Sequence, residues 1–328
     1  MRLPPGPPTC LCLLHSVFQG DFCYSYGMCT MFDELSAHQE NKNDKKVFGL
    51  VLQGGGMRAV YSAGAIRPLI DYGLQDAFEH VIGSSAGAIN GAYLLGADRD
   101  TMLTYTDDLT NKNFVNLLRR ENKVDIDYLV DLVMQHKRPV DISKLLKTNS
   151  KLHIVLTDAK TGKKVVVSDH HKFIEIYEEF RATAALPLLY DKPVLVGGRW
   201  YIDGGVSDLV PIDVAVKLGC TDIVVVLTQR LENFRFDRKH TRLVNHLVKR
   251  FAKNQSAAVR KILPTDERML QLNLRTLTRP TRKKRFYLLQ PSEENYLISL
   301  GTIDKPKVEQ LAKLGVTDMD QFLHAPLQ

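Results

Sequence analysis

The sequence predicts an α/β fold in which a mostly parallel sheet is covered by helices on both faces. Short runs of apolar and β-branched residues alternate with helical patterns along the chain, which favours parallel strands joined by crossover helices. Three of these runs lead into glycine-containing loops. The chain has 328 residues, of which 44% are hydrophobic and 25% charged, so it can bury a substantial core and has the composition of an ordinary globular enzyme.

Two strand–helix pairs open the predicted domain. Val47–Gln53 is an apolar strand that enters a run of three glycines, and Ala59–Tyr72 has apolar residues at helical spacing. Glu79–Ile82 is the end of a second buried strand, and Ala86–Leu95 is a helix rich in small residues. This order places the first two glycine-containing loops at the carboxyl ends of neighbouring strands.

The later elements continue the alternation, and we expect one domain over residues 45–328, with a core over 47–229 and a final strand and helix over 286–328. Further helices are expected over Thr101–His136, His171–Ala184, Pro211–Lys217 and Lys305–Leu314, the last of them capped by Gly315; hairpins over His153–Asp158 with Lys164–Ser168 and over Pro193–Val196 with Arg199–Ile202; and strands over Asp222–Leu227 and Phe286–Leu289.

The first 44 residues are expected to form a disordered tail, and the polar, charged stretch from Glu34 to Lys46 is expected to be a linker. The apolar run from Leu11 to Phe18 is too short to span a bilayer and lacks the features of a signal peptide. Four of the five cysteines lie in the first thirty residues, which argues against a disulfide-stapled core. We therefore expect free thiols and a cytoplasmic protein that can associate peripherally with the inner membrane face.

Positive charge is concentrated late in the chain. From Arg230 to Arg285 there are 17 Lys and Arg against 4 Asp and Glu, in a segment with mostly helical patterning. Two interpretations stay open: a solvated helical face, or a surface that contacts anionic lipid headgroups. Nucleic acid is not an expected partner, because aromatic residues are sparse in this segment and no recognition motif occurs.

Ser85 lies in Gly83-Ser84-Ser85-Ala86-Gly87, between the second strand and its helix. A serine at such a corner is forced into a tight turn that exposes its hydroxyl, and the flanking glycines Gly83 and Gly87 relieve the crowding. The N–H of Ala86 and the positive end of the new helix would face an oxyanion that forms beside Ser85. This pattern is typical of a nucleophilic serine.

Two further loops accompany Ser85. In Gly54-Gly55-Gly56-Met57-Arg58, close backbone approach would let N–H groups bind an oxyanion, and losing one such donor typically lowers turnover by a factor of ~10² to 10³. Arg58 would add positive potential or brace the loop. Asp203, followed by Gly204 and Gly205 after a predicted strand, could accept the Ser85 proton in a partly desolvated site.

These three loops resemble the motifs of the patatin-like phospholipase family: an oxyanion loop G-G-G-x-R/K-G, a G-x-S-x-G elbow and a D-G-G/A motif. Ala184 to Pro187 is similar to the family's S/T-A-A-x-P stretch, and the late strand at Phe286 is similar to a bacterial branch. The resemblance covers about residues 47–229. One departure is Ala59, which stands where the family pattern has glycine.

The resemblance implies a three-layer α/β/α fold and hydrolysis of lipid acyl esters without a metal or cofactor. It also implies roles for single residues. Ser85 would be the nucleophile and Asp203 its general base, while Gly55, Gly56 and Met57 would be the oxyanion-hole donors.

Other interpretations of the same residues remain. The triple glycine could cradle a phosphate in a dinucleotide fold, although the G-x-G-x-x-G spacing fails at Ala59. Asp203-Gly204-Gly205 could be only a turn. A Ser-His-Asp triad could use one of the histidines His170, His171, His240, His246 or His324, of which only the last three follow the acid as an α/β-hydrolase requires.

From these observations we expect a serine acyl hydrolase of the phospholipase A, lysophospholipase or esterase type, with a lipid or fatty-acyl ester as substrate. A Ser85–Asp203 dyad is favoured because no histidine stands in an obvious motif. The alternative from another class is a catalytically idle membrane-binding or regulatory module with the same fold.

Overall fold

A computed structural model describes residues 29–41, 44–168, 170, 173–187, 189–190, 192–234, 255–262, 284–293 and 298–327. Its strands are β1 (Phe48–Leu52), β2 (His80–Ser84), β3 (Lys151–Asp158), β4 (Lys164–Val167), β5 (Val194–Val196), β6 (Arg199–Asp203), β7 (Asp222–Val226) and β8 (Arg285–Leu289). They form one sheet in the order β5-β6-β3-β2-β1-β7-β8, and β4 pairs with β3 outside this path. The five strands from β3 to β8 in this order are parallel, whereas β4 and β6 run antiparallel to β3.

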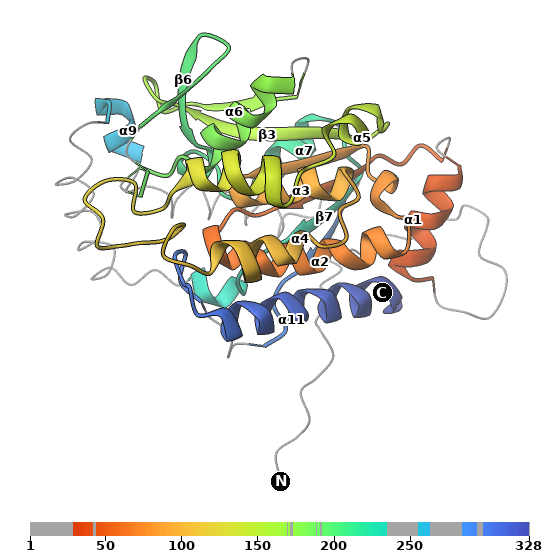
Figure 1. Ribbon diagram of the computed structural model, residues 1–328. Coiled ribbons are helices and arrows are strands. Elements are labelled where there is room, and N and C mark those ends of the chain that lie inside the picture. Colours follow the sequence, from red (N-terminus) through yellow and green to blue (C-terminus); the bar gives the residue numbers. More distant parts are fainter. Residues whose placement is uncertain are drawn as a thin grey trace.

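Helices connect these strands and cover the sheet (Figure 1). The α-helices are α1 (Met31–Glu40), α2 (Val60–Asp71), α3 (Ala86–Leu95), α4 (Thr101–Leu103), α5 (Ile142–Lys147), α6 (Phe173–Ala184), α7 (Ile212–Lys217), α9 (Ala257–Ile262) and α11 (Lys305–His324). Two π-helical segments span Thr104–Leu109 and Tyr128–Lys137, and 3₁₀ turns span Gly56–Ala59, Gln75–Ala77, Gly204–Val206 and Leu231–Phe234.

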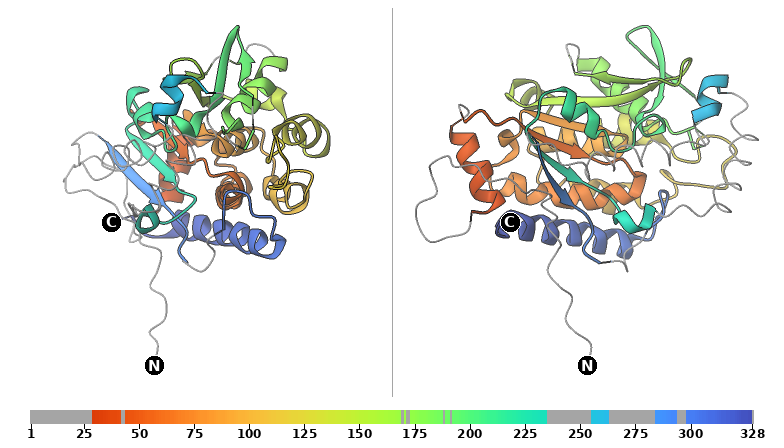
Figure 2. Two further views of the ribbon diagram at one scale, coloured as in Figure 1. Left: turned by 90° about the vertical axis from the view of Figure 1, so that its left-hand side faces the viewer. Right: turned by 180° about the vertical axis from the view of Figure 1, so that it is seen from behind.

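The two faces of the sheet carry separate cores, because successive strand residues point to opposite sides. Leu50 and Leu52 of β1 belong to the core under α2, α3, α6 and α11, whereas Val51 packs with Ile212 and Ala215 of α7. The left view of Figure 2 shows α7 on the side of the sheet away from α2 and α3. The expected α/β architecture, a mostly parallel sheet with helices on both faces, is confirmed.

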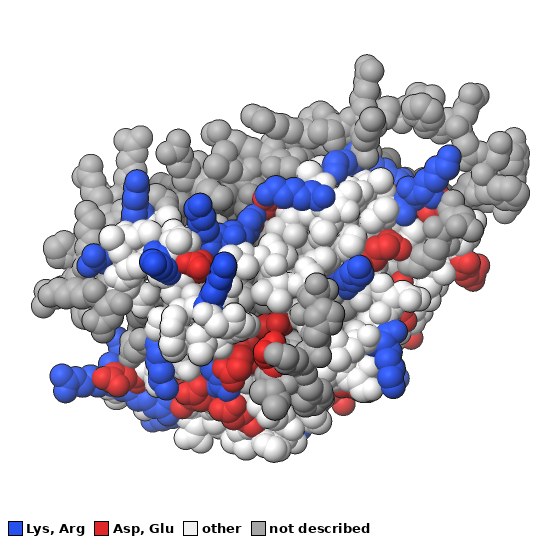
Figure 3. Space-filling view, turned by 90° about the horizontal axis from the view of Figure 1, so that it is seen from above, with Lys and Arg blue, Asp and Glu red and all other residues white. Residues whose placement is uncertain are grey.

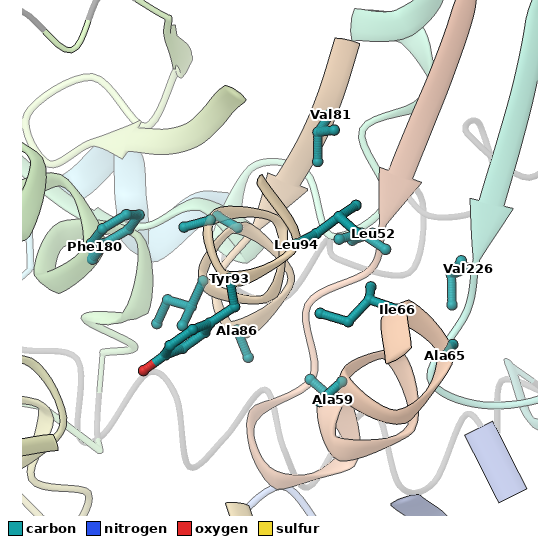
Figure 4. Packing of buried hydrophobic residues seen from close by; sticks show 14 of the residues in the cluster. Leu52, Ala59, Ala65, Ile66, Val81, Ala86, Tyr93, Leu94, Phe180 and Val226 are labelled. Carbon is teal, nitrogen blue, oxygen red and sulfur yellow. The ribbon is translucent and has the colours of Figure 1, made fainter. Parts of the chain in front are cut away.

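Side chains from three neighbouring strands meet helices α2 and α3 in the larger core. Leu52, Val81 and Val226 belong to one buried cluster with Ile66 and Leu94 (Figure 4). All five side chains are fully buried, and each contributes roughly 1.5–3 kcal/mol relative to an exposed position. This packing holds the carboxyl ends of β1 and β2 in fixed positions, which is where the two glycine-containing loops begin.

Helices α2 and α11 lie side by side along most of their length (Figures 1 and 2). Gly64 and Gly315 allow this close approach: an added Cβ would lie 2.1 Å from the carbonyl oxygen of Ala312 and 2.1 Å from that of Tyr61, respectively. The expectation that Gly315 ends the last helix is therefore wrong. Gly315 lies inside a 20-residue helix, where it serves as a contact point between helices.

The polar stretch expected to be a linker forms helix α1 instead. Thr30 caps it, since its side chain accepts a hydrogen bond from the Asp33 N–H while Asp33 accepts one from the Thr30 N–H. Met31 and Leu35 are buried in the larger core. Helix α1 is therefore not part of a disordered tail, because a capping box and two apolar anchors outweigh a polar composition. Residues 1–28 lie outside the described part of the chain.

The expectation that Thr101–His136 is helical is confirmed at its two ends but is wrong for the middle. The chain forms α4, the first π-helical segment, an irregular loop and then the second π-helical segment. Phe114 is buried, but Leu117 and Leu118 are 65% and 97% exposed, although their spacing fits one helical face. The irregular loop is stabilised by side-chain contacts instead, notably those of Asn111 and Arg119.

Most of the basic segment from Arg230 to Arg285 lies outside the described residues, but its last two members have structural partners. Lys284 donates to the carbonyl oxygens of Val216 and Cys220, and Arg285 pairs with the buried Asp222 at 2.5 Å. Both lie where β8 begins, at the edge of the sheet opposite the glycine-containing loops. These two residues therefore stabilise the start of β8.

Charge on the surface seen from above is mixed. In Figure 3 the Lys and Arg side chains are spread over this face, with acidic side chains between several of them. Within the described ranges, none of the helices combines the length and the apolar character needed to cross a bilayer.

Candidate active site

Ser85 occupies the corner between β2 and α3, with φ +54° and ψ −134°. A side chain rarely tolerates a positive φ, so this backbone is strained. Glycine on either side makes the turn possible: an added Cβ at Gly83 would lie 2.4 Å from the Ala88 nitrogen, and one at Gly87 would lie 2.3 Å from the Leu52 carbonyl oxygen. The turn places the half-buried Ser85 at the positive end of α3.

Asp203 lies at the end of β6 and contacts Ser85 directly. The Ser85 hydroxyl donates to Oδ2 of Asp203 over 2.8 Å, and the Gly205 N–H donates to Oδ1 over 2.7 Å. The residue is only 3% exposed. Burial raises the pKa of Asp203 to about 7, against the two hydrogen bonds, which favour the ionised form. Near neutral pH this carboxyl group therefore exists in both protonation states.

The backbone of Asp203 is fixed from two sides. Its N–H donates to the carbonyl oxygen of Ala185 over 3.0 Å, and its own carbonyl accepts the Thr157 hydroxyl proton over 2.8 Å. The next residue, Gly204, packs against β3, where an added Cβ would lie 2.0 Å from the Val155 carbonyl oxygen. The carboxyl group is thus held on rigid elements, which keeps its distance to Ser85 constant.

The triple-glycine loop packs against the Ser85 corner. A Cβ on Gly54 would lie 2.8 Å from the carbonyl oxygen of Ser84 and 3.1 Å from Cβ of Ser85. The Gly54 N–H donates a hydrogen bond to the carbonyl oxygen of Leu209. The N–H groups of Gly55 and Gly56 make no hydrogen bond to another part of the described chain, and they lie at the start of a 3₁₀ turn. These two groups remain available to a ligand beside Ser85.

Met57, the third expected oxyanion-hole donor, has a different partner. Its N–H donates to the carbonyl oxygen of Leu300 over 2.9 Å. Leu300 belongs to the segment between β8 and α11, which sequence spacing does not connect with the glycine loop. In this structure Met57 therefore has no free N–H to offer an oxyanion.

Arg58 braces the loop. One of its terminal nitrogens donates to Oε1 of Gln229 over 2.7 Å, while its Nε is buried without a partner among the described residues. Burial lowers the pKa of this guanidinium from its usual value, although an arginine stays charged at any ordinary pH. The arrangement links the glycine loop to the segment that follows β7.

An apolar cavity opens on Ser85 and Asp203. Its volume is about 680 Å³ when the open mouth is included. Apart from the two polar groups of the site, its walls are mostly hydrophobic: Met57, Ile89, Leu109, Phe114, Val124, Ile126, Leu129, Leu186, Leu189 and Leu300. Such a cavity suits a hydrocarbon chain whose polar end lies at Ser85.

The described histidines of the alternative triad lie elsewhere. His170 is buried between Glu179, at 2.6 Å, and the Leu152 carbonyl oxygen, at 3.0 Å. His324 donates to the Asp320 carbonyl at the end of α11. Neither has a hydrogen bond to Ser85 or Asp203, whereas His171, His240 and His246 lie outside the described residues.

Comparison with known proteins decides the family. A family model described as patatin-like phospholipase matches residues 50–216, about half of the chain. The chain belongs to the patatin-like phospholipase family. The resemblance drawn from the three loops is thereby confirmed, and Ser85, Asp203 and the glycine loop all lie within the matched residues.

Relatives of this patatin-like chain match it only in part. The uncharacterized protein YjjU of Escherichia coli K12 is 26% identical over 186 residues, which cover 55% of this chain and 51% of YjjU. Mouse Pnpla3, named 1-acylglycerol-3-phosphate O-acyltransferase, is 32% identical over 80 residues, 24% of this chain and 19% of its own length. The chain therefore spans about half, or less, of these relatives.

Two solved structures also resemble it. VipD from Legionella pneumophila gives a TM-score of 0.44 at 14% identity and covers 86% of this chain and 67% of its own. Human GIVD cytosolic phospholipase A2, solved with a fluorophosphonate inhibitor, gives 0.45 at 12% identity, with coverage of 89% and 60%.

One residue of this patatin-like site was missed from the sequence. The Thr183 hydroxyl oxygen accepts the Ser85 N–H over 2.9 Å and donates to the Val155 carbonyl over 2.7 Å. It thereby ties the strained corner to β3. The signal was present, because Thr183 occupies the S/T position of the S/T-A-A-x-P stretch that ends at Pro187.

Proposed function

We propose that this chain is a serine hydrolase that cleaves acyl esters of lipids, with Ser85 as nucleophile and Asp203 as its general base. The observation that carries the proposal is the 2.8 Å hydrogen bond between Ser85 Oγ and Asp203 Oδ2, two residues that line an apolar cavity. Membership of the patatin-like phospholipase family supports lipid acyl esters as the substrate class.

In the first half of the reaction Ser85 Oγ attacks the ester carbonyl carbon. Its proton passes to Oδ2 of Asp203, which is basic enough to accept it because burial holds the pKa of Asp203 near 7. The carbonyl oxygen becomes negative and binds the N–H groups of Gly55 and Gly56, with support from the positive end of α3. As the tetrahedral species collapses, Asp203 returns the proton to the departing lipid alcohol.

In the second half water replaces the alcohol. Asp203 removes a proton from a water molecule, the resulting oxygen attacks the acyl–Ser85 carbonyl, and the same two N–H groups bind the oxyanion again. Collapse releases the fatty acid and returns the proton from Asp203 to Ser85 Oγ. During both halves the Gly205 N–H holds Oδ1 in place, so only Oδ2 exchanges protons.

The cavity supports a long acyl chain as the group that is bound. Each CH₂ group of the chain that moves from water into contact with the hydrophobic walls would contribute roughly 0.8 kcal/mol to the free energy of binding. A headgroup would lie outside the cavity, because the walls are mostly hydrophobic.

Substitution of Ser85 tests the nucleophile, and its neighbour offers a matched control. Ser84 Oγ is buried and has no hydrogen-bond partner among the described residues, so Ser84→Ala changes the same atoms one position away. We expect Ser85→Ala to lose labelling by a fluorophosphonate probe and to lose activity by a factor of ~10² or more. Ser84→Ala should keep both.

The substrate is then identified by product analysis with phospholipids, lysolipids and short-chain esters. A wild-type protein that neither reacts with the probe nor releases fatty acid would establish the idle module instead. Activity that survives Ser85→Ala would be consistent with a hydrolase but would show that Ser85 is not its nucleophile.

A further inference from the structure

The loop from Lys112 to Lys123, between the two π-helical segments, exposes two adjacent leucines. Leu117 and Leu118 are 65% and 97% exposed, the highest values of any large hydrophobic side chain in the described part of the chain. A single exposed leucine is common on protein surfaces, whereas these two neighbours together form a small exposed apolar patch. The loop projects at the left of Figure 1, in yellow.

Hydrogen bonds hold the leucines in this exposed position. A terminal nitrogen of Arg119 donates to the carbonyl oxygens of Lys112, at 3.2 Å, and Asn113, at 3.0 Å. The Asn116 N–H donates to the Lys123 carbonyl over 2.8 Å, and the side chain of Asn116 accepts the Leu118 N–H over 3.1 Å. The tip is therefore a built feature of the loop.

The inner side of the same loop faces the cavity. Phe114 lines it, as does Val124, the residue that follows the loop, and the Val124 N–H donates to the carbonyl oxygen of Leu189, another lining residue, over 2.9 Å. Leu117 and Leu118 line no part of it. The loop thus joins the wall of the cavity to an exposed apolar tip.

The charges around the tip suit an anionic surface. Between residues 112 and 123 there are four basic residues and one acidic residue, and both Lys112 and Arg120 are exposed. Two contributions hold an interfacial segment on a bilayer: apolar side chains enter the acyl region, and basic side chains contact the anionic headgroups. A protein partner would more often bury its apolar anchors in the centre of a broad interface, away from such charges.

We propose that the Lys112–Lys123 loop docks the protein on an anionic lipid bilayer, with Leu117 and Leu118 among the acyl chains and Lys112 and Arg120 at the phosphates. This inference rests on the proposed function, because a lipid ester must leave a membrane to reach Ser85. Docking through this loop places the wall of the cavity at the bilayer surface. The basic pair at Lys284 and Arg285 lies at the opposite edge of the sheet and takes no part.

Vesicle binding tests the docking, measured with inactive Ser85→Ala protein so that the lipid stays intact. The vesicles contain phosphatidylglycerol in phosphatidylcholine. We expect the double variant Leu117→Ser/Leu118→Ser to lower the partition coefficient roughly tenfold or more. Leu146→Ser is the matched control, since Leu146 is 48% exposed on α5, at the other end of the molecule (Figure 1), and should bind as the parent does.

A second variant keeps the test independent of the leucines. Arg120→Glu should weaken binding to the anionic vesicles several-fold at low salt, and the effect should shrink as salt is added. Binding that is unchanged in both variants would overturn the proposal.

Hydrolysis separates this inference from the proposed function. In the active background, Leu117→Ser/Leu118→Ser should hydrolyse a soluble short-chain ester at the wild-type rate but release less fatty acid from vesicles. Equal loss on both substrates would place the leucines in the cavity wall and contradict docking. A protein with no esterase activity at all would refute the proposed function, whereas the vesicle-binding result would still stand.

Discussion

The carbonyl oxygen of Leu300 accepts a 2.9 Å hydrogen bond from the N–H of Met57, so a late segment of the chain holds the glycine loop. The contact is tight, because an added Cβ on Gly56 would lie 2.6 Å from the same oxygen. The loop is therefore fixed by Gln229 through Arg58 on one side and by Leu300 on the other. This relationship explains why Gly55 and Gly56, but not Met57, have N–H groups free for a ligand.

Substitution of Gly56 should lower activity by more than the strain of a side chain at positive φ would alone. We expect Gly56→Ala to lower activity by a factor of ~10² or more, because its methyl group would displace Leu300 and shift the oxyanion donors. Gly73→Ala is the control: Gly73 also has a positive φ, +70°, but nothing lies within 4 Å of an added Cβ. The measurement is the rate on a soluble ester, and equal loss in both variants would count against the Leu300 contact.

The rate on a soluble ester should depend on the ionisation of Asp203. Burial holds the pKa of Asp203 at about 7, and only the ionised form accepts the Ser85 proton. We expect kcat/KM to rise with pH up to about 7 and then to level off, falling roughly tenfold per pH unit below that value. A profile that is flat from about pH 5 upward would show that Asp203 is not the base.

Asp203→Asn should abolish activity and yet stabilise the protein at high pH. The folded carboxyl group holds its proton up to about pH 7, whereas its ordinary pKa is 3.8, so stability falls as pH rises between these values. Above about pH 7 the ionised group costs up to about 4 kcal/mol, which asparagine avoids. Urea unfolding should therefore show a gain at about pH 8 that disappears near pH 4.

The double variant Ser85→Ala/Asp203→Asn should be hardly less active than either single variant, since two groups that act as one unit behave non-additively. Losses that multiply would contradict a dyad.

Acid should destabilise the fold through a pair of histidines. Nδ1 of His80 and Nε2 of His153 lie 2.9 Å apart, and burial, then His80, His170 and Lys151, lower the pKa of His153 to about 3. When the pKa of a histidine is lower in the folded state than in the unfolded state, the protein loses stability as pH falls below the unfolded pKa of about 6.5. At about pH 5 the cost is about 2 kcal/mol, and His153→Asn should reduce this pH dependence of unfolding.

The contact between α2 and α11 should be sensitive to a single methyl group. Gly315→Ala places Cβ 2.1 Å from the Tyr61 carbonyl oxygen, so we expect a loss of about 3 kcal/mol or more in the free energy of unfolding. Gly301→Ala is the control, because its Cβ would meet the Val115 side chain at an ordinary 3.4 Å. A variant as stable as this control would show that the two helices separate at little cost.

The central strands and the Ser85 corner follow from local patterns. The expected helix Ala86–Leu95 has the same bounds as α3, and Val47–Gln53 contains β1. These segments are buried on both faces, so their apolar runs, bounded by glycine, leave little ambiguity. The same applies to Ser85, because a serine between Gly83 and Gly87 after a strand has few other conformations.

Features that depend on distant partners were not predictable. The spacing of Phe114, Leu117 and Leu118 fits a helix, yet periodicity does not tell which apolar residue finds a cavity and which remains outside. Gly315 has the position of a helix cap, but the nearby α2 makes it a packing site. The link from Leu300 to the glycine loop joins residues that no local motif connects.

The place of Leu300 in the chain also bears on the order of synthesis. All three motif loops precede Gln229, whereas β8, the Leu300 segment and α11 follow it. A nascent chain that has emerged only as far as Gln229 carries Ser85 and Asp203 but lacks the carbonyl that holds the glycine loop. Since a domain generally folds as a unit, the candidate site would stay incomplete until the last part of the domain had left the ribosome.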